Sequence, residues 1–381
     1  MRKVWIIRSN PVNPDSRVEK LALTLKEQKY DIKIFAWDRE KNYGIKIEEK
    51  NLFNKEKIDI YRKGIKATFG GGFKKNIFSL LKFQISLLKS LIQNRKDIDI
   101  VHACDFDTGL TCFIFAKMFR KKIIYDIFDY YLDCCNVPKI LYYLIKVLDN
   151  FVINNSDVVV LCNEQRIEQI EGTHPKKIVI IHNTPIQNCK FQSEQIKNNI
   201  NRKIKIVYVG IFMKKERMLE ELMEVVAENK EYELHIAGFG EIEEQVKEYS
   251  KKSENIKYYG KISYVETLEL ESNCDIMVAI YNPNKRNHYF AAPNKFYEAL
   301  MLGKPLIMVK GTGMSEIIEK NKLGEVIQFN KFSLKEGLKN LSNCKKEWES
   351  IGKKMKKIYT EEYSWNEMRK RIINLYKEVS K

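Results

Sequence analysis

The chain has 381 residues, of which 44% are hydrophobic and 31% are charged. This length fits two domains of ordinary size, and the composition excludes long disorder. The formal net charge of +17 suits nucleic acid, an anionic membrane or phosphorylated small molecules, although lysines on solvated faces would account for part of it.

The opening segment has no pattern of a signal peptide, because residues 1–3 lead directly into a short strand-like run. The sequence contains no apolar stretch near the roughly 18 residues that span a bilayer. Its eight cysteines lack paired metal spacing, so we expect reduced thiols. Together these features predict a cytoplasmic protein.

The first half of the chain predicts a parallel sheet. Residues 3–8 and 30–37 are strand-like apolar runs, and residues 17–28 between them have helical periodicity, which together make a βαβ unit. Further predicted strands lie at 98–102, 122–126, 158–161 and 178–182. We expect residues 1–187 to form one doubly wound, Rossmann-like domain.

The second half repeats this alternation after a polar stretch at 188–202, which predicts a linker. Strands are predicted at 204–209, 233–237 and 256–259, with helices at 218–227 and 242–250, and the pattern continues to 325–329. Residues 203–363 thus predict a second Rossmann-like domain, and helix 364–381 is expected to pack back on the first. Two doubly wound α/β domains facing a central cleft suit a reaction of two substrates.

Two strand ends that carry glycine are candidates for binding a diphosphate. Gly210 lies shortly before a predicted helix, whose free N–H groups attract anions, and Arg217 lies in the same turn. Gly238 and Gly240 repeat the arrangement. A tight strand-to-helix turn would need the same glycines, so each signal is weak alone. No third glycine completes the dinucleotide fingerprint, which disfavours a dehydrogenase.

The segment 293–305 is the most informative, because a proline opens a predicted helix that a glycine and a second proline close. Lys295 and Glu298 lie on one face of that helix. An ion pair within the helix would account for them, but a lysine at a helix N-terminus is unfavourable unless an anion docks there. We therefore predict a phosphate at Lys295 and ribose hydroxyls at Glu298, with Pro293 and Asn294 in the same binding site.

These motifs resemble those of family 4 glycosyltransferases of GT-B fold, over nearly the whole chain. The resemblance rests on the proline, lysine and glutamate of segment 293–298, on Gly210 with Arg217, and on Gly238-Phe239-Gly240. It implies a retaining transfer of a sugar from a nucleotide-sugar donor, with no cofactor and no metal. Arg217 and Lys295 would then be the catalytic cations that stabilise the leaving diphosphate.

The first half resembles the acceptor domain of bacterial polysaccharide members of that family. The candidates on the acceptor side are Asn10, His102, Asp105 and Asp129, and a structural role is an alternative for both aspartates. Relatives often carry a glutamate eight residues before the one that matches Glu298, and histidines at two acceptor-side positions. This chain has Phe290, Cys104 and Phe128 there.

Two amphipathic segments, 76–92 and 138–148, bear on the acceptor. Their apolar positions follow helical spacing with basic residues beside them, Lys74 and Lys75 among these. Such helices either face the core or lie in the interface of an anionic membrane. We predict a saccharide acceptor, lipid-linked and reached at the inner face of the membrane, in the synthesis of a surface polysaccharide or glycan.

Two alternatives share this architecture: a nucleotide-sugar epimerase, which needs no acceptor, and a non-catalytic relative that binds saccharide or nucleotide. A nucleic-acid-binding protein belongs to another class. It is disfavoured because the basic residues are dispersed rather than interleaved with aromatic residues in one stripe. We therefore predict no nucleic acid as a partner.

Overall fold

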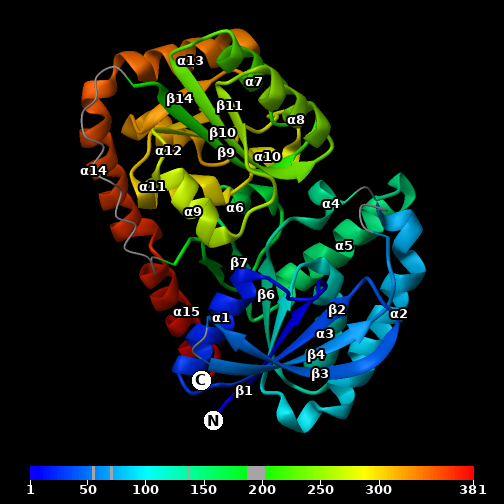
Figure 1. The fold of residues 1–381 in the computed structure, drawn as a ribbon. Helices are drawn as coiled ribbons and strands as arrows, with labels where there is room; N and C mark the ends of the chain where they lie inside the picture. Colours follow the sequence, from blue (N-terminus) through cyan, green and yellow to red (C-terminus); the bar gives the residue numbers. More distant parts are fainter. Residues whose placement is uncertain (54–55, 69–71, 136, 187–201) are drawn as a thin grey trace. The chain divides into compact units, whose positions relative to one another are not determined.

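The computed structural model describes residues 1–53, 56–68, 72–135, 137–186 and 202–381 (Figure 1). They divide into a first unit, residues 1–183 with 368–381, and a second unit, residues 184–367. Each unit has one largely parallel sheet with helices, which confirms the predicted α/β fold of two Rossmann-like domains. Positions 188–201 of the predicted linker and the side chain of Lys74 lie outside the described part.

The sheet of the first unit has the strand order β3-β4-β2-β1-β5-β6-β7-β8. Its strands are β1 (Lys3–Arg8), β2 (Asp31–Asp38), β3 (Tyr43–Leu52), β4 (Glu56–Gly64), β5 (Ile100–Cys104), β6 (Lys122–Ile127), β7 (Val158–Leu161) and β8 (Ile178–Ile180). The edge strand β3 pairs antiparallel with β4, and the other pairs are parallel. Strands β1, β5 and β6 are almost wholly buried, as expected of strands covered on both faces.

The helices of the first unit are α1 (Ser16–Glu27), α2 (Gly72–Gln93), α3 (Phe106–Met118), α4 (Tyr131–Cys134), α5 (Lys139–Asn155), α6 (Arg166–Gln169) and most of α15 (Trp365–Val379). Asp15 caps α1 by accepting from the N–H of Val18. Helix α3 packs against both α2 and α5. Within α15, the hydroxyl of Tyr376 lies 2.8 Å from Nδ1 of His102, which ties the end of the chain to this unit.

The second unit has a six-stranded parallel sheet in the order β11-β10-β9-β12-β13-β14. Its strands are β9 (Ile204–Phe212), β10 (Tyr232–Gly240), β11 (Ile256–Tyr258), β12 (Ile276–Ala279), β13 (Leu306–Val309) and β14 (Gly324–Ile327). Its helices are α7 (Leu219–Ala227), α8 (Glu243–Lys252), α9 (Tyr264–Ser272), α10 (Arg286–Tyr289), α11 (Asn294–Leu302), α12 (Ser315–Asn321), α13 (Lys331–Asn343) and α14 (Trp348–Ile358). A capping box of Ser263 and Glu266 begins α9.

Two strands of the second unit run past their predicted ends, because β9 continues to Phe212 and β10 to Gly240. The glycines therefore lie within the paired strands rather than in loops. Gly238 pairs with Gly210, and Gly240 pairs with Phe212. A Cβ atom on Gly238 or Gly240 would collide with the backbone of β9, so this close approach requires glycine.

Candidate donor and acceptor sites

The strand order of the second unit reverses between β9 and β12, and ligands of open α/β sheets bind beyond the carboxyl ends of the strands at such a point. Gly210 lies near the end of β9, and Tyr281 follows β12. Lys295 lies in the first turn of α11, and Arg217 in the connection from β9 to α7. The predicted donor residues thus surround the reversal point of one sheet.

The side chain of Lys295 lies against the end of β9. Its Nζ lies 4.6 Å from the ring centroid of Tyr208 and 6.0 Å from that of Tyr281. A Cβ atom at Gly210 would stand 2.9 Å from Nζ, so a larger residue there would displace the ammonium. Burial by itself lowers the pKa of Lys295, but Tyr281, Tyr208 and more distant carboxylates outweigh it and raise the pKa. The ammonium is therefore charged at neutral pH.

Arg217 lies on the same tyrosine from another element. Its guanidinium carbon is 4.1 Å from the ring centroid of Tyr281, and its Nη1 donates to Nε2 of His288 at 3.2 Å. Nδ1 of His288 lies 3.0 Å from the carbonyl of Asn282, which fixes the proton on Nδ1 and leaves Nε2 as an acceptor. Burial, followed by the charge of Arg217, lowers the pKa of His288, so a neutral imidazole holds the guanidinium.

In the described second unit neither cation has a carboxylate as a direct partner, although the charges of Glu298 and Glu271 act on Lys295 from farther away. Within residues 202–381, Arg217 and Lys295 form no ion pair, and the nearby carboxylate of Glu216 pairs with Lys285 instead. Their contacts are neutral imidazole, carbonyl, thioether and aromatic groups. The structure brings the two predicted catalytic cations together. An external anion can neutralise their two positive charges.

Two buried carboxyl groups lie behind Lys295. Glu298 is 3% exposed and hydrogen-bonds with Tyr264, and Glu271 of α9 is 1% exposed. Oε2 of Glu271 has no hydrogen-bond partner in the described part of the chain. Burial, and then the negative charge of Glu298, raises the pKa of Glu271 well above its ordinary value, while Lys295 opposes the shift. Ionisation of Glu271 and Glu298 at the same time is therefore unfavourable.

The remaining donor-side positions take simpler roles. Pro293 caps α11, and the exposed Asn294 is its first residue. Phe290 is buried against Tyr289, so no carboxylate stands at that position.

The strand order of the first unit also reverses, between β1 and β5, and Arg8 ends β1 at that point. Arg8 donates from Nε to Asp15 at 3.0 Å and forms a second ion pair with Asp105. Asn10 donates to the same oxygen of Asp15 at 2.8 Å. Asn10 and Asp105 thus belong to one network around Arg8.

Asp105 follows β5 in a backbone conformation with φ of +63° and ψ of 168°, which residues other than glycine rarely adopt. Its Oδ1 accepts from the N–H groups of Phe128, at 2.8 Å, and Asp129, at 3.2 Å. Burial is the main cause that raises the pKa of Asp105 to about 6, with Arg8 opposing it. A carboxyl group held in a strained position at the end of a strand is typical of functional sites.

The side chains of the other two acceptor-side candidates have different partners. His102 is 1% exposed and contacts Asp126 and Tyr376, so it belongs to the interior. The side chain of Asp129 is half exposed and pairs with Arg166 at 3.0 Å. The ring of Phe128 contacts both Arg8 and Arg17, whose guanidinium carbons each lie 4.2 Å from its centroid.

Four residues of these sites were not among the predicted site residues: Arg8, Tyr208, Tyr281 and Glu271. Arg8 and Tyr281 each stand at or just beyond the end of an apolar strand, a signal that would have found both. Tyr208 lies inside a strand and reads as core. Glu271 lies in a helix rich in glutamate, where a carboxylate reads as solvated.

No helix in the described ranges is both long enough and apolar enough to cross a membrane. The cysteines that the structure describes are all free thiols.

Comparison with known proteins identifies the class. Residues 190–373 match the sequence profile of the glycosyl transferases group 1. Sucrose-phosphate synthase from Thermosynechococcus elongatus has a similar fold (TM-score 0.77, 14% identity, 100% of this chain and 99% of that chain). So do HepE from Anabaena in complex with UDP (0.70, 13%, 99% and 100%) and the lipopolysaccharide outer core galactosyltransferase WaaB (0.68, 15%, 99% and 100%). No curated protein sequence matches the chain significantly.

The fold is therefore GT-B, the two-domain architecture that the sequence predicts. The protein is a glycosyltransferase, and it carries the domain of the glycosyl transferases group 1 over residues 190–373.

Proposed function

We propose that this glycosyltransferase binds a nucleotide-sugar donor at the strand reversal between β9 and β12. It transfers the sugar to a saccharide acceptor with retention of anomeric configuration and without a metal ion. The observation that carries the proposal is the pair Arg217 and Lys295, two charged side chains without a carboxylate partner in the described second unit. A diphosphate is an anion of matching charge.

The chemistry follows from this charge. When the bond between the anomeric carbon and the diphosphate breaks, negative charge grows on the leaving group, and fixed cations stabilise it there. The rings of Tyr208 and Tyr281 partly shield the two cations from water, which strengthens this interaction. Glu298 supplies a carboxylate for the ribose hydroxyls. HepE was solved with UDP, so UDP-sugars are the first donors to test.

Donor use is tested by incubating the protein with UDP-, GDP-, ADP- and CMP-sugars, with and without saccharide acceptors. We expect nucleotide release that depends on one nucleotide and on an acceptor, that persists in EDTA, and a product with the donor's anomeric configuration by proton NMR. Conversion of a nucleotide sugar without acceptor would instead identify an epimerase. Nucleotide binding without any turnover would identify a non-catalytic relative.

We further propose that the acceptor is lipid-linked and that the first unit docks on an anionic membrane. Helices α2, α3 and α5 form one layer and expose apolar side chains at helical spacing. This docking surface consists of Phe78, Leu81, Ile85, Ile114, Met118, Ile140, Tyr143, Leu144, Val147 and Phe151. A protein does not ordinarily leave so many large apolar side chains in water.

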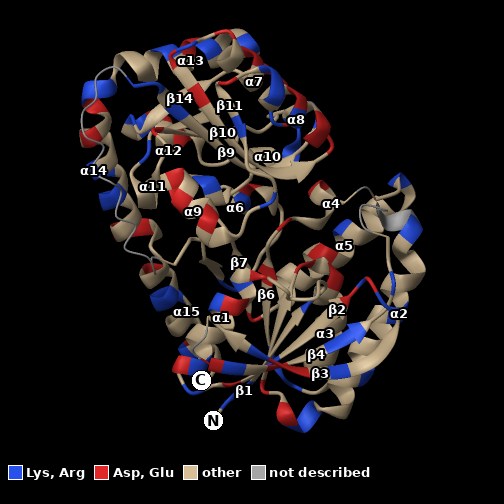
Figure 2. Cartoon of the chain, in the orientation of Figure 1, with Lys and Arg blue, Asp and Glu red and all other residues tan. Residues whose placement is uncertain are grey.

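The charge of the docking surface selects its partner. Along one face of α2, lysine and apolar residues alternate at positions 75, 78, 82, 85 and 89, and α2 has no acidic residue (Figure 2). Lys117 of α3 and Lys139 and Lys146 of α5 add exposed cations. A surface of this kind suits the anionic inner leaflet, where each lysine near the lipid heads contributes about 1 kcal/mol. We therefore place the protein in the cytoplasm, at the inner face of the membrane.

Vesicle flotation tests docking separately from donor binding. The double variant Phe78→Ser with Ile140→Ser should lose most of its binding to anionic vesicles. Phe332→Ser with Val265→Ser is a matched control, because these apolar side chains of the second unit are also exposed, Phe332 to 76% like Phe78. Equal losses in both variants, or no flotation of the unmodified protein, would contradict docking through this surface.

A further inference from the structure

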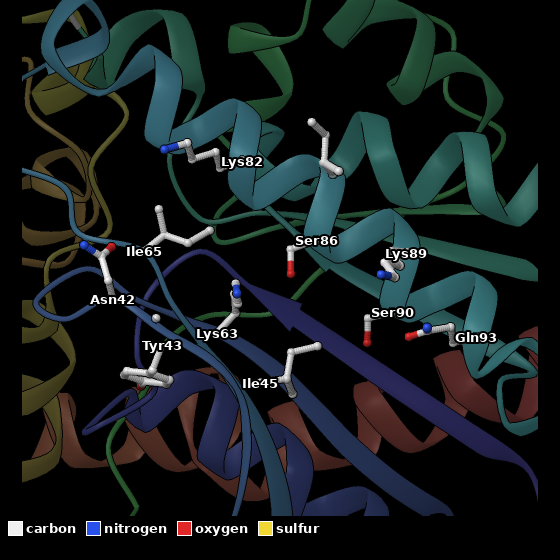
Figure 3. A pocket seen from close by; sticks show the side chains of 12 residues that line it. Asn42, Tyr43, Ile45, Lys63, Ile65, Lys82, Ser86, Lys89, Ser90 and Gln93 are labelled. Carbon is white, nitrogen blue, oxygen red and sulfur yellow. The ribbon is translucent and has the colours of Figure 1, made fainter.

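A pocket of about 810 Å³ lies between the β3-β4 hairpin and α2 (Figure 3). It shares Ile85 with the docking surface. It is lined by Asn42, Tyr43, Ile45, Lys63, Gly64, Ile65, Lys82, Ile85, Ser86, Lys89, Ser90 and Gln93. The sequence patterns did not predict the hairpin, so they gave no indication of this pocket. The donor and acceptor candidates described above do not include its residues.

Three lysines from two elements line the pocket: Lys63 from β4, and Lys82 and Lys89 from α2. No acidic side chain is among the lining residues. Within the described ranges, none of the three lysines forms an ion pair or a side-chain hydrogen bond. Three cations on the walls of one pocket, with no acidic side chain among the lining residues, make it positively charged, so the pocket favours an anion.

The hydroxyls of Ser86 and Ser90 lie one turn apart on α2, on the side that also carries Lys82 and Lys89. A phosphate group has several acceptor oxygens in a tetrahedral arrangement and accepts from ammonium and hydroxyl donors together. A carboxylate has two oxygens in one plane and satisfies fewer such donors at once. The donor set therefore matches phosphate better than a carboxylate.

The apolar part of the pocket points to the source of that phosphate. Ile85 and the two lysines of α2 belong both to the pocket and to the face of α2 that forms the docking surface. On the opposite wall, the ring of Tyr43 lies against Gly64, where a Cβ atom would collide with it. A ligand with a charged head and an apolar body fits a pocket that continues into an apolar surface.

We propose that the pocket lined by Lys63, Lys82 and Lys89 binds the phosphate of an anionic phospholipid head group, so that the protein distinguishes phosphate-bearing lipids from other anionic lipids. This inference rests on the proposed membrane docking and deepens it. The apolar side chains supply insertion into the membrane, and the lysine pocket supplies head-group selectivity.

The test compares vesicles of matched surface charge, in which the anionic lipid is either phosphatidate or cholesteryl hemisuccinate, a carboxylate. We expect the unmodified protein to bind phosphatidate vesicles at least about fivefold more tightly, the effect of roughly one lysine at a membrane surface. Inorganic phosphate or glycerol phosphate should compete at millimolar concentration, while chloride at equal ionic strength should not.

The pocket variant Lys63→Gln with Lys82→Gln and Lys89→Gln should bind both kinds of vesicle equally. The control Lys75→Gln with Lys117→Gln and Lys146→Gln removes the same charge from exposed positions outside the pocket, so it should weaken both kinds but keep the preference. Thermal stabilisation by UDP reports folding and donor binding in every variant.

Any one of three results would overturn the inference. These are no preference of the unmodified protein between the lipids, the same preference in both triple variants, and binding of free phosphate without any gain on phosphatidate vesicles. Each leaves docking itself intact if the Phe78→Ser and Ile140→Ser variant still loses flotation. Absence of flotation in the unmodified protein would instead contradict the proposed docking.

Discussion

The two units place charged groups at the same point of their sheets, but they treat that charge differently. In the second unit, Arg217 and Lys295 stand beside neutral partners at the reversal between β9 and β12. In the first unit, Arg8 pairs with two aspartates at the reversal between β1 and β5, and Arg17 pairs with Asp126. Equivalent positions of two similar folds thus present open charge in one unit and balanced charge in the other.

This difference indicates what each unit recognises. Open cations favour an anionic ligand, such as the diphosphate of a nucleotide sugar. A balanced network of arginine, carboxyl and amide groups offers hydrogen bonds with little net charge, which suits the hydroxyl groups of a neutral saccharide. The following predictions test that division of roles.

The largest effect is expected from removing the open cations. Lys295→Met or Arg217→Gln should lower the rate of sugar transfer by about 100- to 1,000-fold, because each removes a fixed charge beside the leaving diphosphate. Steady-state kinetics with the cognate donor measure this loss. Lys310→Gln, at an exposed lysine of the same unit, is the control and should retain activity. Retention of activity in both site variants would contradict the claim that the second unit presents open charge to the diphosphate.

An intermediate effect is expected at the two buried glutamates, Glu298 and Glu271. Replacing each with glutamine distinguishes their roles in nucleotide binding. Glu298→Gln should weaken nucleotide binding by about ten- to 100-fold, because a hydrogen bond to a charged group contributes about 1.5 to 3 kcal/mol. Glu271→Gln should retain nucleotide binding. Isothermal titration of the two variants with UDP measures the difference, and equal losses would place both carboxyl groups against the ligand.

Glu271 also has a pH signature. Its pKa is raised in the folded protein, so its contribution to stability is full at low pH and is lost as pH rises. Glu271→Gln should therefore gain stability relative to the unmodified protein as pH rises. Urea unfolding at several pH values measures this trend, and the opposite trend would mean that the folded protein favours the ionised carboxylate.

The smallest effect concerns Asp105 in the first unit. Its pKa of about 6 lies above that of an unfolded aspartate, so stability from its protonated form is lost as pH rises through 6. Between pH 5 and 7.5 the unmodified protein should lose about 1 kcal/mol of unfolding free energy relative to Asp105→Asn. Urea unfolding at both pH values measures it. A difference that stays constant with pH would show that Asp105 is ionised throughout.

Sequence patterns predicted most of the fold because both sheets are built from buried strands. The β3-β4 hairpin was missed because Tyr43–Leu52 is an edge strand exposed along most of its length, so it lacks an apolar pattern. The sequence patterns predicted that β9 and β10 end too early, just before Gly210 and Gly238. Only the pairing of Gly210 with Gly238 explains why glycine continues those strands instead of ending them.

The candidate donor site was predictable where its residues occur in one segment, as Lys295 and Glu298 do. The contact of Arg217 with His288 joins residues 71 positions apart, and no local spacing reports it. Glu271 was missed for a similar reason, since its burial depends on how α9 packs on α11. Whether a charge is open or balanced is thus a property of the fold and not of the motif.

The most direct test of the open charge compares uridine, UMP and UDP by isothermal titration. The account predicts that affinity rises steeply with each phosphate, and that Arg217→Gln with Lys295→Met removes most of this rise while binding of uridine is retained. Should another base prove cognate, its nucleoside, monophosphate and diphosphate replace these ligands. Equal affinity for nucleoside and diphosphate, or an undiminished rise in the double variant, would contradict the assignment of Arg217 and Lys295 to the donor diphosphate.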